Sequence, residues 1–454
     1  MDVEILARVQ FALTIMFHYI YPPLSIGLGL ILVIIEGIYL KTGGEFWKDM
    51  AKFWTGIFAL TFAIGVATGI VMEFEFGTNW ATYSRYVGDV FGSALAAEGV
   101  FAFFLESGFL AILLFGWSRV SKGFHFFSTC MVALGAHFSA IWIIVANSWM
   151  QTPAGFKIVG EGLQARAEIV DFWAMVFNPS SVNRLLHSII GAWLAAAFLV
   201  ISISAWYLLK KRHEEFARLS LKIGLFVAGF SLLFQLFSGH ESAEGVAKYQ
   251  PAKLAAFEGV YQTQKGAPLS LFGIPDSESK RVRYRIEIPK MLSFFVTGDF
   301  DGEVIGLDRY PEKDWPKVGA VFQTYHLMIA CWVIMVVLVS FAALFWKREG
   351  KFLLWGLVLS SLAPQIANQA GWVSAEMGRY PWIVQDLLRI SDGLSKSVRA
   401  EQVAGSLALF GILYFFLFIL FLYLLNEKIR QGPKIAADTP LYPHLKELSD
   451  VTFS

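Results

Sequence analysis

Long apolar stretches, separated by shorter polar connections, dominate the pattern along this chain. A helix that crosses a bilayer needs about 20 mostly apolar residues. Nine stretches approach or exceed that length, at residues 10–40, 53–75, 92–117, 126–149, 185–209, 221–238, 319–346, 352–373 and 403–426. The pattern therefore predicts an all-α fold, a polytopic membrane bundle of nine transmembrane helices. The first stretch is overlong and contains Pro22 and Pro23, which predict a kink or a break in the helix.

Basic residues in the short connections alternate from one side of the predicted bundle to the other. They follow the first, third, fifth, seventh and ninth stretches, at Lys41, Lys48, Lys52, Arg119, Lys122, Lys210, Lys211, Arg212, Arg218, Lys347, Arg348, Lys351, Lys428 and Arg430. By the positive-inside rule, the N-terminus is outside and the C-terminus is cytoplasmic. We therefore expect three parts: helices one to six in residues 1–238, an external loop at 239–318, and helices seven to nine with a cytoplasmic tail at 319–454.

Composition supports a membrane protein and excludes some partners. The chain has 454 residues, of which 56% are hydrophobic and 16% charged. Its 37 basic and 36 acidic residues nearly balance, so nothing indicates binding to nucleic acid. The two cysteines, Cys130 and Cys331, form neither CxxC nor CxxCH, which excludes haem attached covalently through that motif.

Two carboxylates interrupt the third apolar stretch, at Glu98 and Glu106. An ionisable group at that depth in a bilayer is costly and needs a compensating partner. A metal, a proton path or a bound cation would each compensate. The alternative is a pair of protonated carboxyl groups, hydrogen-bonded inside the bundle.

Other unusual polar residues fall at one depth once the orientation is applied. His18, Glu98, His187, Met328 and Glu376 lie on different helices, yet all are expected near the outer face. Scattered core residues would have no reason to agree in depth. Because haem iron takes histidine, methionine and carboxylate ligands, a cluster of haems near the outer face would explain the agreement.

The local sequence supports this interpretation unevenly at the two histidines. His18 precedes Pro22 by four residues, so its carbonyl lacks the usual helical donor and the helix opens beside the imidazole. A histidine satisfied inside the core is the alternative. His187 shares one helix face with Gly191 and Ala195. That face would admit a flat macrocycle, but small residues also let helices pack closely.

The other candidates lie on the seventh and eighth stretches. Met328 alone would be core filler in most helices. Trp372, Glu376 and Arg379 recur at helical spacing and share a face. Arg379 could hold a haem propionate or act on Glu376, and the alternative is an interfacial aromatic residue beside an ion pair.

The chain resembles subunit I of the cytochrome bd quinol oxidases over nearly its whole length. The matching stretches are RVQFALTIMFHYIYPPL, FWTGIFALTFAIGVATGIVMEFEFGTNW, AAEGVFAFFLES, SAIWIIVANSWMQ, LFGIPD and AEMGRYPW. They are long, collinear and specific. The resemblance implies a haem enzyme that oxidises quinol and reduces dioxygen.

The resemblance also implies which residues hold the haems. A low-spin haem b would take His187 and Met328 as axial ligands. Two high-spin haems, one of type b and one of type d, would take His18, Glu98 and Glu376, and the site of each type is left open. Trp372 matches a residue placed for electron transfer among the haems.

Proton transfer and quinol oxidation are implied at two further places. Glu106, Ser107 and Ser139 match a proton route that reaches the haems from the cytoplasm. Lys253 and Glu258 in the external loop match residues linked to quinol oxidation, where the carboxylate would accept a proton and the lysine would stabilise the oxyanion. The alternative for that segment is a solvated amphipathic helix.

Two positions depart from the pattern of many family members. The motif GRQPW is GRYPW here, which leaves Arg379 intact, and His326 stands where many members have an arginine. The second departure puts a propionate contact near the low-spin haem in doubt, or makes it depend on pH.

The predicted function is a terminal quinol oxidase in a bacterial or archaeal cytoplasmic membrane. It would build a membrane potential without pumping protons. Its expected partners are a second membrane subunit, a small single-helix subunit, quinol and dioxygen. A quinone-linked b-type cytochrome without oxygen chemistry is one alternative. A proton or ion transporter that uses Glu98 and Glu106 is another.

Overall fold

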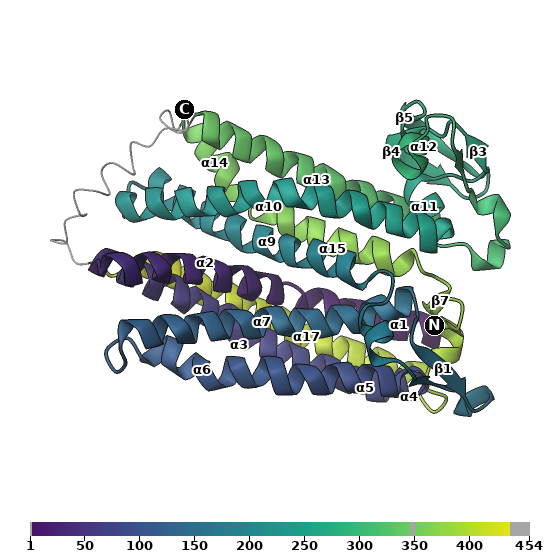
Figure 1. The fold of residues 1–454 in the computed structure, drawn as a ribbon, viewed down its shortest axis with the longest axis horizontal. Helices are drawn as coiled ribbons and strands as arrows, with labels where there is room; N and C mark the ends of the chain where they lie inside the picture. The colour runs from purple at the N-terminus through teal and green to yellow at the C-terminus, as the bar shows by residue number, and fades with distance from the viewer. Residues whose placement is uncertain (1, 346–349, 436–454) are drawn as a thin grey trace.

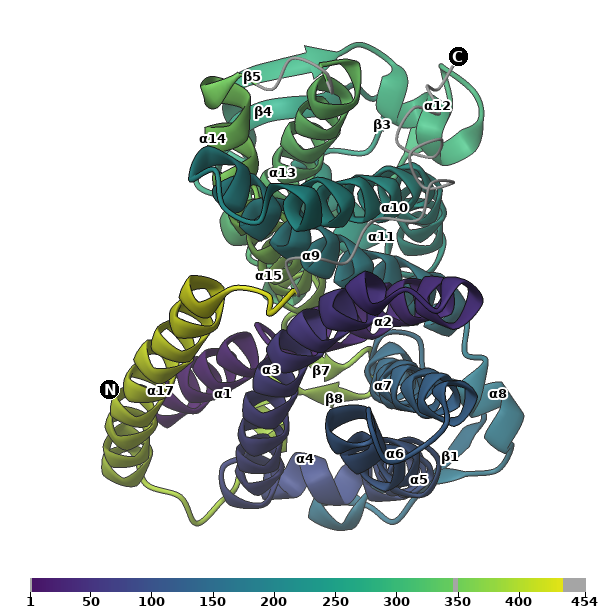
Figure 2. The ribbon, with the colours of Figure 1, turned by 90° about the vertical axis from the view of Figure 1, so that its left-hand side faces the viewer.

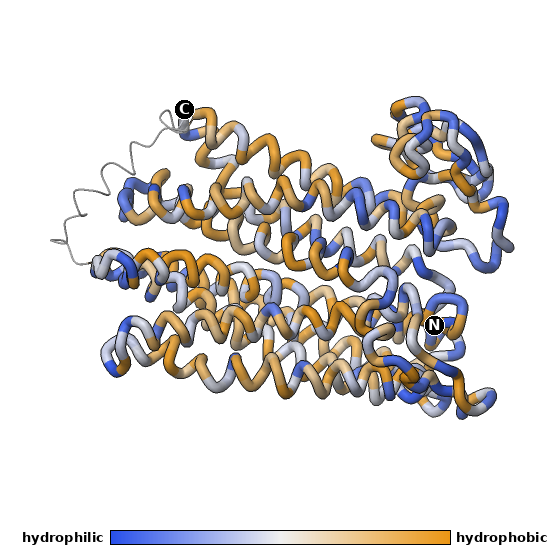
Figure 3. Tube along the Cα trace, viewed as in Figure 1, coloured by the Kyte–Doolittle hydropathy of each residue, from blue (hydrophilic) through white to orange (hydrophobic). Residues whose placement is uncertain are grey.

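The computed structural model describes residues 2–345 and 350–435 of the chain, which form a mostly helical bundle (Figure 1). Within these residues, eight helical segments are long and apolar enough to cross a membrane. The last residue of the predicted seventh span, 346, and the predicted tail beyond 435 lie outside the described residues. Figure 3 shows that apolar residues cover the length of the bundle, whereas polar residues gather at its two ends.

The long helices correspond closely to the predicted stretches. They are α1 (Val3–His18), α2 (Pro22–Thr42), α3 (Glu45–Thr78), α5 (Gly88–Ala97) continuing into α6 (Phe104–Phe115), α7 (Lys122–Gln151), α9 (Ser181–Leu209), α10 (Glu214–Tyr249), α13 (Val318–Leu344), α14 (Lys351–Leu359), α15 (Leu362–Met377) and α17 (Ala400–Gln431). Short helices α4 (Ala81–Tyr86), α8 (Phe172–Val176) and α16 (Ile390–Gly393) lie in the connections.

The break predicted in the first stretch is confirmed. Helix α1 ends at His18 and α2 begins at Pro22, so His18 occupies the last helical turn before the break. The prolines stand in the first turn of α2, where a missing N–H costs nothing. The sequence thus places the imidazole at a helix end.

The eighth predicted stretch forms two shorter helices, α14 and α15, which are separated at Ser360 and Ser361. Neither helix alone has the length of a full crossing, and they are not among the eight long segments. Pro364 lies in the first turn of α15, where its ring is tolerated. Ser360, Ser361 and Pro364 mark the break in the sequence, but the prediction of one continuous stretch did not use them.

Glycines allow the central helices to approach closely. Figure 2 shows α2 and α9 between two groups of helices, with α10, α13, α14 and α15 on one side and α1, α3, α5–α7 and α17 on the other. A Cβ at Gly27 would lie 2.5 Å from that of Ala196 on α9, and one at Gly29 would lie 3.3 Å from Ala133 on α7. Close backbone approach is how helices associate where surrounding lipid removes the hydrophobic driving force.

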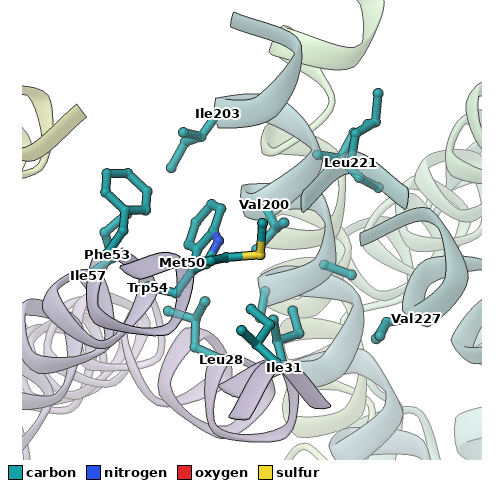
Figure 4. Packing of buried hydrophobic residues seen from close by; sticks show 14 of the residues in the cluster. Leu28, Ile31, Met50, Phe53, Trp54, Ile57, Val200, Ile203, Leu221 and Val227 are labelled. Atoms are coloured by element: carbon teal, nitrogen blue, oxygen red, sulfur yellow. The ribbon is translucent and has the colours of Figure 1, made fainter. Parts of the chain in front are cut away.

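A cluster of buried side chains fills the contact between α2, α3, α9 and α10. Figure 4 shows Met50 and Trp54 of α3 pointing toward Val200 on α9. The indole of Trp54 is fully buried and donates a hydrogen bond of 3.2 Å to Ser220 Oγ on α10. A buried indole N–H that finds an acceptor avoids the cost of an unmade hydrogen bond.

The segment between α10 and α13 forms a small domain at one end of the bundle, which we call the loop domain (residues 250–317). Helix α10 continues to Tyr249, so the predicted boundary at 238 is too early. The loop domain contains helices α11 (Pro251–Glu258) and α12 (Met291–Thr297). Its strands are β3 (Gln264–Lys265), β4 (Leu269–Asp276), β5 (Arg281–Ile288) and β6 (Glu303–Val304), paired antiparallel as β4–β5 and β3–β6.

Two further hairpins lie at the same end as the loop domain (Figure 1). Strands β1 (Phe156–Val159) and β2 (Arg166–Ile169) pair antiparallel, as do β7 (Trp382–Val384) and β8 (Leu388–Arg389). The β7–β8 hairpin follows α15 directly, so it lies beside the residues at the end of that helix.

Candidate functional site

Trp372 on α15 connects the helices that carry the predicted haem ligands. Its indole packs edge-on against Tyr19, the residue after His18, with ring centroids 5.5 Å apart. The guanidinium of Arg184, one turn before His187 on α9, lies 5.6 Å from the centroid of the Trp372 ring. Trp372 thus lies between the end of α1 and the start of α9, one turn from Glu376 on its own helix.

Glu376 is the centre of a hydrogen-bond network that we call the Glu376 hub, formed by Glu376, Arg379, Asn147, Gln151 and Arg184. Arg379 Nη2 donates to Glu376 Oε2 at 2.6 Å, and the Asn147 and Gln151 amides each donate to Oε1 at 3.2 Å. Arg184 donates to the amide oxygen of Asn147. Helices α7, α9 and α15 therefore all contribute to holding one carboxylate.

Lys253 links the loop domain to the Glu376 hub. Its ammonium nitrogen lies 2.5 Å from Gln151 Oε1 and 2.8 Å from Gln250 Oε1, and the residue is only 3% exposed. Burial holds the pKa of Lys253 well below its usual range, and the nearby Arg184 and Arg379 lower it further. The amine therefore acts as a hydrogen-bond donor rather than as a fixed positive charge.

Met328 lies against α15 beside Trp372. A Cβ at Gly371 would lie 2.8 Å from the Met328 sulfur, so only glycine fits at that position. Helices α13 and α15 pack extensively along their lengths. The thioether of Met328, on α13, therefore lies against α15, the helix that carries Trp372 and Glu376.

The imidazole of His187 is oriented by side chains of α10. Its Nδ1 lies 3.1 Å from Ser238 Oγ, and the Ser238 hydroxyl donates in turn to the carbonyl of Gln235. The Gln235 amide nitrogen lies 3.1 Å from the same Nδ1, so these contacts are compatible with the proton on either ring nitrogen. The Gln235 amide nitrogen lies 3.0 Å from Nε2, so a metal bound there would require Gln235 to turn away.

The space beside Gly191 is occupied by a side chain of α15. A Cβ at Gly191 would lie 2.7 Å from Asn368 Oδ1 on α15, and the Asn368 amide donates to the Gly191 carbonyl at 3.1 Å. Close approach of α9 and α15 at this face is therefore observed.

His18 has one ring nitrogen fixed by α3. Its Nδ1 lies 2.9 Å from Thr68 Oγ1, and the Thr68 hydroxyl donates to the Ile64 carbonyl at 2.9 Å. Nδ1 therefore carries the proton, and Nε2 keeps a lone pair for a metal. Gly69 allows this approach, because a Cβ there would lie 3.2 Å from His18 Cε1.

Glu98 begins a π-helical turn (Glu98–Phe103) between α5 and α6. Such turns are rare and frequently occur at functional sites. The Ser139 hydroxyl of α7 donates to Glu98 Oε1 at 2.5 Å. The sequence had grouped Ser139 with Glu106, and the structure instead joins it directly to Glu98.

Glu106, on α6, contacts α7 one helical turn away from Ser139. Its side chain packs against Gly135, where a Cβ would lie 2.6 Å from Glu106 Cγ, and it is 8% exposed. Glu98 and Glu106 are near enough to interact electrostatically. Ser107 faces away: it is exposed on the surface of this subunit, and its hydroxyl donates to the Phe103 carbonyl of its own helix at 2.8 Å.

Glu258 faces a different part of the loop domain from Lys253, although both lie on α11. Lys253 and Glu258 are five positions apart, which places their side chains on different sides of the helix. Glu258 is 1% exposed and accepts a hydrogen bond of 3.1 Å from the Ser270 N–H of β4. Burial raises the pKa of Glu258 to about 7, which suits a group that gains and loses a proton near neutral pH.

His326 ties α13 to the loop domain. Its ring stacks on Phe322 at 4.0 Å, and its Nε2 lies 2.9 Å from the Ser270 carbonyl. The residue that departs from the family pattern therefore contacts the strand next to Glu258.

Several polar residues that take part in contacts inside the bundle were not predicted from the sequence. Asn147, Gln151 and Arg184 complete the Glu376 hub, and Arg184 could have been found because it stands one turn before His187. Two further carboxylates are buried and have polar partners in the bundle. Glu75 accepts a hydrogen bond of 2.6 Å from Thr14, and Glu36 contacts His125 at 2.9 Å. Their partners lie far away in sequence, so no spacing revealed them.

The donor set fits haem better than an ion held by side chains alone. Among residues 2–345 and 350–435, no group of three or more histidine, cysteine or carboxylate side chains could hold a metal ion. A haem brings four nitrogens of its own and needs only one or two protein ligands, as His18, His187, Met328 and Glu376 could provide. Arg379 Nη1 is buried without a hydrogen-bond partner, which suits the carboxylate of a propionate.

Comparisons with known proteins agree with this arrangement. The family "Cytochrome bd terminal oxidase subunit I" matches residues 6–433. The chain is 36% identical to the cytochrome bd ubiquinol oxidase subunit 1 of Bacillus subtilis, with 94% of each chain covered, and 35% identical to the cytochrome bd-II ubiquinol oxidase subunit 1 of Escherichia coli, with 95% and 97% covered. The bd oxidase structure from Geobacillus thermodenitrificans superposes with a TM-score of 0.87 at 30% identity, covering 95% of this chain and 99% of that one. The chain is therefore a member of the cytochrome bd terminal oxidase subunit I family.

Proposed function

We propose that this chain is the haem-bearing subunit of an electrogenic terminal quinol oxidase that does not pump protons. Two quinols and one dioxygen would give two quinones and two waters. Quinol would release its protons at the loop-domain end, and the protons for water would arrive from the opposite end. This separation alone generates a membrane potential.

The observation that carries the proposal is the position of Trp372 and Glu376 on one face of α15. That face meets Tyr19 beside His18 and Arg184 beside His187, and the adjacent Gly371 meets the sulfur of Met328. Residues at three other helices, α1, α9 and α13, thus converge on this part of α15. A transporter would not need a thioether and two imidazoles on helices that meet around one tryptophan.

Haem, when bound, would supply one-electron transfer and the reduction of dioxygen. His187 and Met328 would hold a low-spin haem b. His18 and Glu376, with Glu98 nearby, would hold a high-spin haem b and a haem d. Arg379 would bind a propionate while keeping Glu376 anionic.

Glu258 would act as the base when quinol is oxidised. It is buried beside β4, and its pKa of about 7 lets it accept a hydroxyl proton and release it again. Lys253 would help to bind quinol as a hydrogen-bond donor and to stabilise its oxyanion. Its hydrogen bond to Gln151 would join quinol binding to the Glu376 hub.

Glu106, Ser139 and Glu98 would carry protons toward the haems. Glu106 packs against α7 one turn from Ser139, and Ser139 donates directly to Glu98. A bare charge is prohibitive in the bilayer, so a chain of carboxyl and hydroxyl groups provides the route. Ser107 is at the subunit surface, so its place in the route requires a partner to cover it.

A second membrane subunit would cover the least buried helices. The most apolar window of the α5–α6 segment is 17% buried and that of α17 is 11% buried, against 72% for α9. We also propose a small single-helix subunit and nine crossings in total, with the loop-domain end outside. The family and the apolar helices place the protein in the bacterial cell membrane.

One spectrum of the reduced protein tests the proposal. We expect the α-bands of low-spin haem b, high-spin haem b and haem d. Met328→Leu keeps the volume but removes the sulfur, so the low-spin band should disappear. Met335→Leu, two turns along α13 and buried, is the matched control and should leave that band unchanged. A low-spin band that survives Met328→Leu would refute the ligand assignment.

A further inference from the structure

Ser270, the second residue of β4, makes two hydrogen bonds to Glu258. Its N–H donates to the carboxylate Oε2 at 3.1 Å, and its hydroxyl donates to the backbone carbonyl of Glu258 at 2.9 Å. Both residues are buried, with exposed fractions of 4% and 1%. One serine therefore fixes both the side chain of Glu258 and the end of the helix that carries it.

Ser270 is itself held by two other elements. Arg285 Nε on β5 donates to its hydroxyl at 3.1 Å, and His326 Nε2 on α13 contacts its carbonyl at 2.9 Å. The hydroxyl thus accepts from Arg285 while it donates to Glu258. Every polar atom of Ser270 is engaged, so its position is determined from three sides.

The groups that act on the Glu258 carboxylate differ in kind. Ser270 provides the direct hydrogen bond, and Arg285 acts from β5 through its charge. On α13, Tyr325 interacts electrostatically with Glu258, and His326 reaches it only through Ser270. The direct contact is therefore a neutral N–H, whose placement depends on the serine hydroxyl.

We propose that Ser270 is a positioning residue that aims the Glu258 carboxylate at the hydroxyl proton of bound quinol. The inference rests on the proposed role of Glu258 as the base. A general base must lie within hydrogen-bond reach of the proton that it removes. Small misplacements of a reacting group slow its reaction strongly. The contacts that Ser270 makes with Glu258, Arg285 and His326 would therefore keep the carboxylate in its reactive position.

The test compares Ser270→Ala, Ser270→Thr and Ser279→Ala in the complete oxidase. Ser270→Ala removes the hydroxyl and loosens the N–H from the carboxylate. We expect kcat for quinol oxidation to fall about tenfold with little change in KM. The pH profile should move to higher pH by about half to one unit, because the Ser270 hydrogen bond lowers the pKa of Glu258.

Two variants separate positioning from general damage to the fold. Ser270→Thr retains the hydroxyl and should restore most of the rate and the original pH profile. Ser279→Ala removes an exposed hydroxyl from the turn of the same hairpin, where it bonds only to Asp276, and should behave like the parent. All three proteins should keep their haem bands.

The Glu258→Gln background distinguishes the inference from the function on which it rests. There, Ser270→Ala should cause no further loss, because the two residues act through one group. The infrared carboxyl band that Glu258→Gln removes should titrate at higher pH in Ser270→Ala. If Glu258→Gln oxidises quinol normally, the proposed base is wrong. If Glu258→Gln is slow but Ser270→Ala has parental kinetics and pH profile, only the positioning role is overturned.

Discussion

Two carboxylates at the loop-domain end of the molecule, Glu376 and Glu258, have opposite surroundings. Glu376 meets Arg379 directly at 2.6 Å and has Arg184 and Lys253 nearby. Glu258 is deeply buried, and its direct contact is the neutral N–H of Ser270. Cations favour a permanent negative charge, whereas burial beside neutral donors allows the charge to come and go.

This difference matches the two proposed roles. A haem ligand has to remain an anion through every turnover, and the contacts of the Glu376 hub favour that state. A proton acceptor has to change its charge twice in each cycle, which the surroundings of Glu258 allow near neutral pH. In this proposal, the same residue type would serve two functions because of its neighbours and not because of its depth.

The largest effect should come from removing the charge of Glu376. In Glu376→Gln the hub keeps its amide contacts, but Arg379 becomes a buried cation without its partner, which costs about 3–5 kcal/mol. We expect one high-spin haem to be lost and oxygen uptake to fall at least about a hundredfold. Haem content and the thermal unfolding midpoint, measured beside Glu258→Gln, check this.

Glu258→Gln has no comparable buried cation to strand, so its unfolding midpoint should stay near that of the parent. If both variants lost the same stability, the two sites would not differ as described.

Glu106 extends the comparison to a third carboxylate, whose electrostatic neighbour is another carboxylate, Glu98. We expect Glu106→Leu to leave the low-spin haem reducible by quinol but to slow oxygen reduction about a hundredfold. Oxygen uptake and haem reduction by quinol, followed separately, test this. The parent oxidase in vesicles should acidify the loop-domain side, and turnover without any membrane potential would contradict the proton route.

The smallest effect should come from Lys253. Burial lowers the pKa of Lys253 well below its usual range, and its ammonium nitrogen donates to Gln151 and Gln250, so we expect these hydrogen bonds to be its main contribution. Lys253→Met keeps the length of the side chain, and we expect KM for quinol to rise about threefold to tenfold with kcat nearly unchanged. A loss in kcat as large as that of Glu258→Gln would show that Lys253 is charged during turnover.

The fold was largely predictable because crossing a membrane leaves a strong local signal. The break before Pro22 followed from the sequence. The break at Ser360 was not predicted, although two serines and Pro364 interrupt the apolar pattern there. The end of α10 at Tyr249 was not predicted, because the helix continues beyond its apolar stretch, which ends at residue 238. The additional helical residues pack against the loop domain.

The site was predictable where one helix carries the pattern and not where distant elements meet. The shared face of Trp372, Glu376 and Arg379 is a property of one helix and could be read from spacing. The role of Gly191 depends on Asn368 of another helix. Likewise, Glu258 depends on Ser270, and no spacing along the chain predicts that contact.

The pH dependence of oxygen uptake, measured with quinol and with an artificial donor that bypasses the quinol site, tests the central claim most directly. With quinol, activity should rise with pH around a midpoint near 7, because Glu258 must lose its proton before it can accept one. That midpoint should vanish in Glu258→Gln and should be absent with the artificial donor, while the anionic Glu376 adds no transition of its own. The same midpoint with both donors, or one that survives Glu258→Gln, would contradict the account.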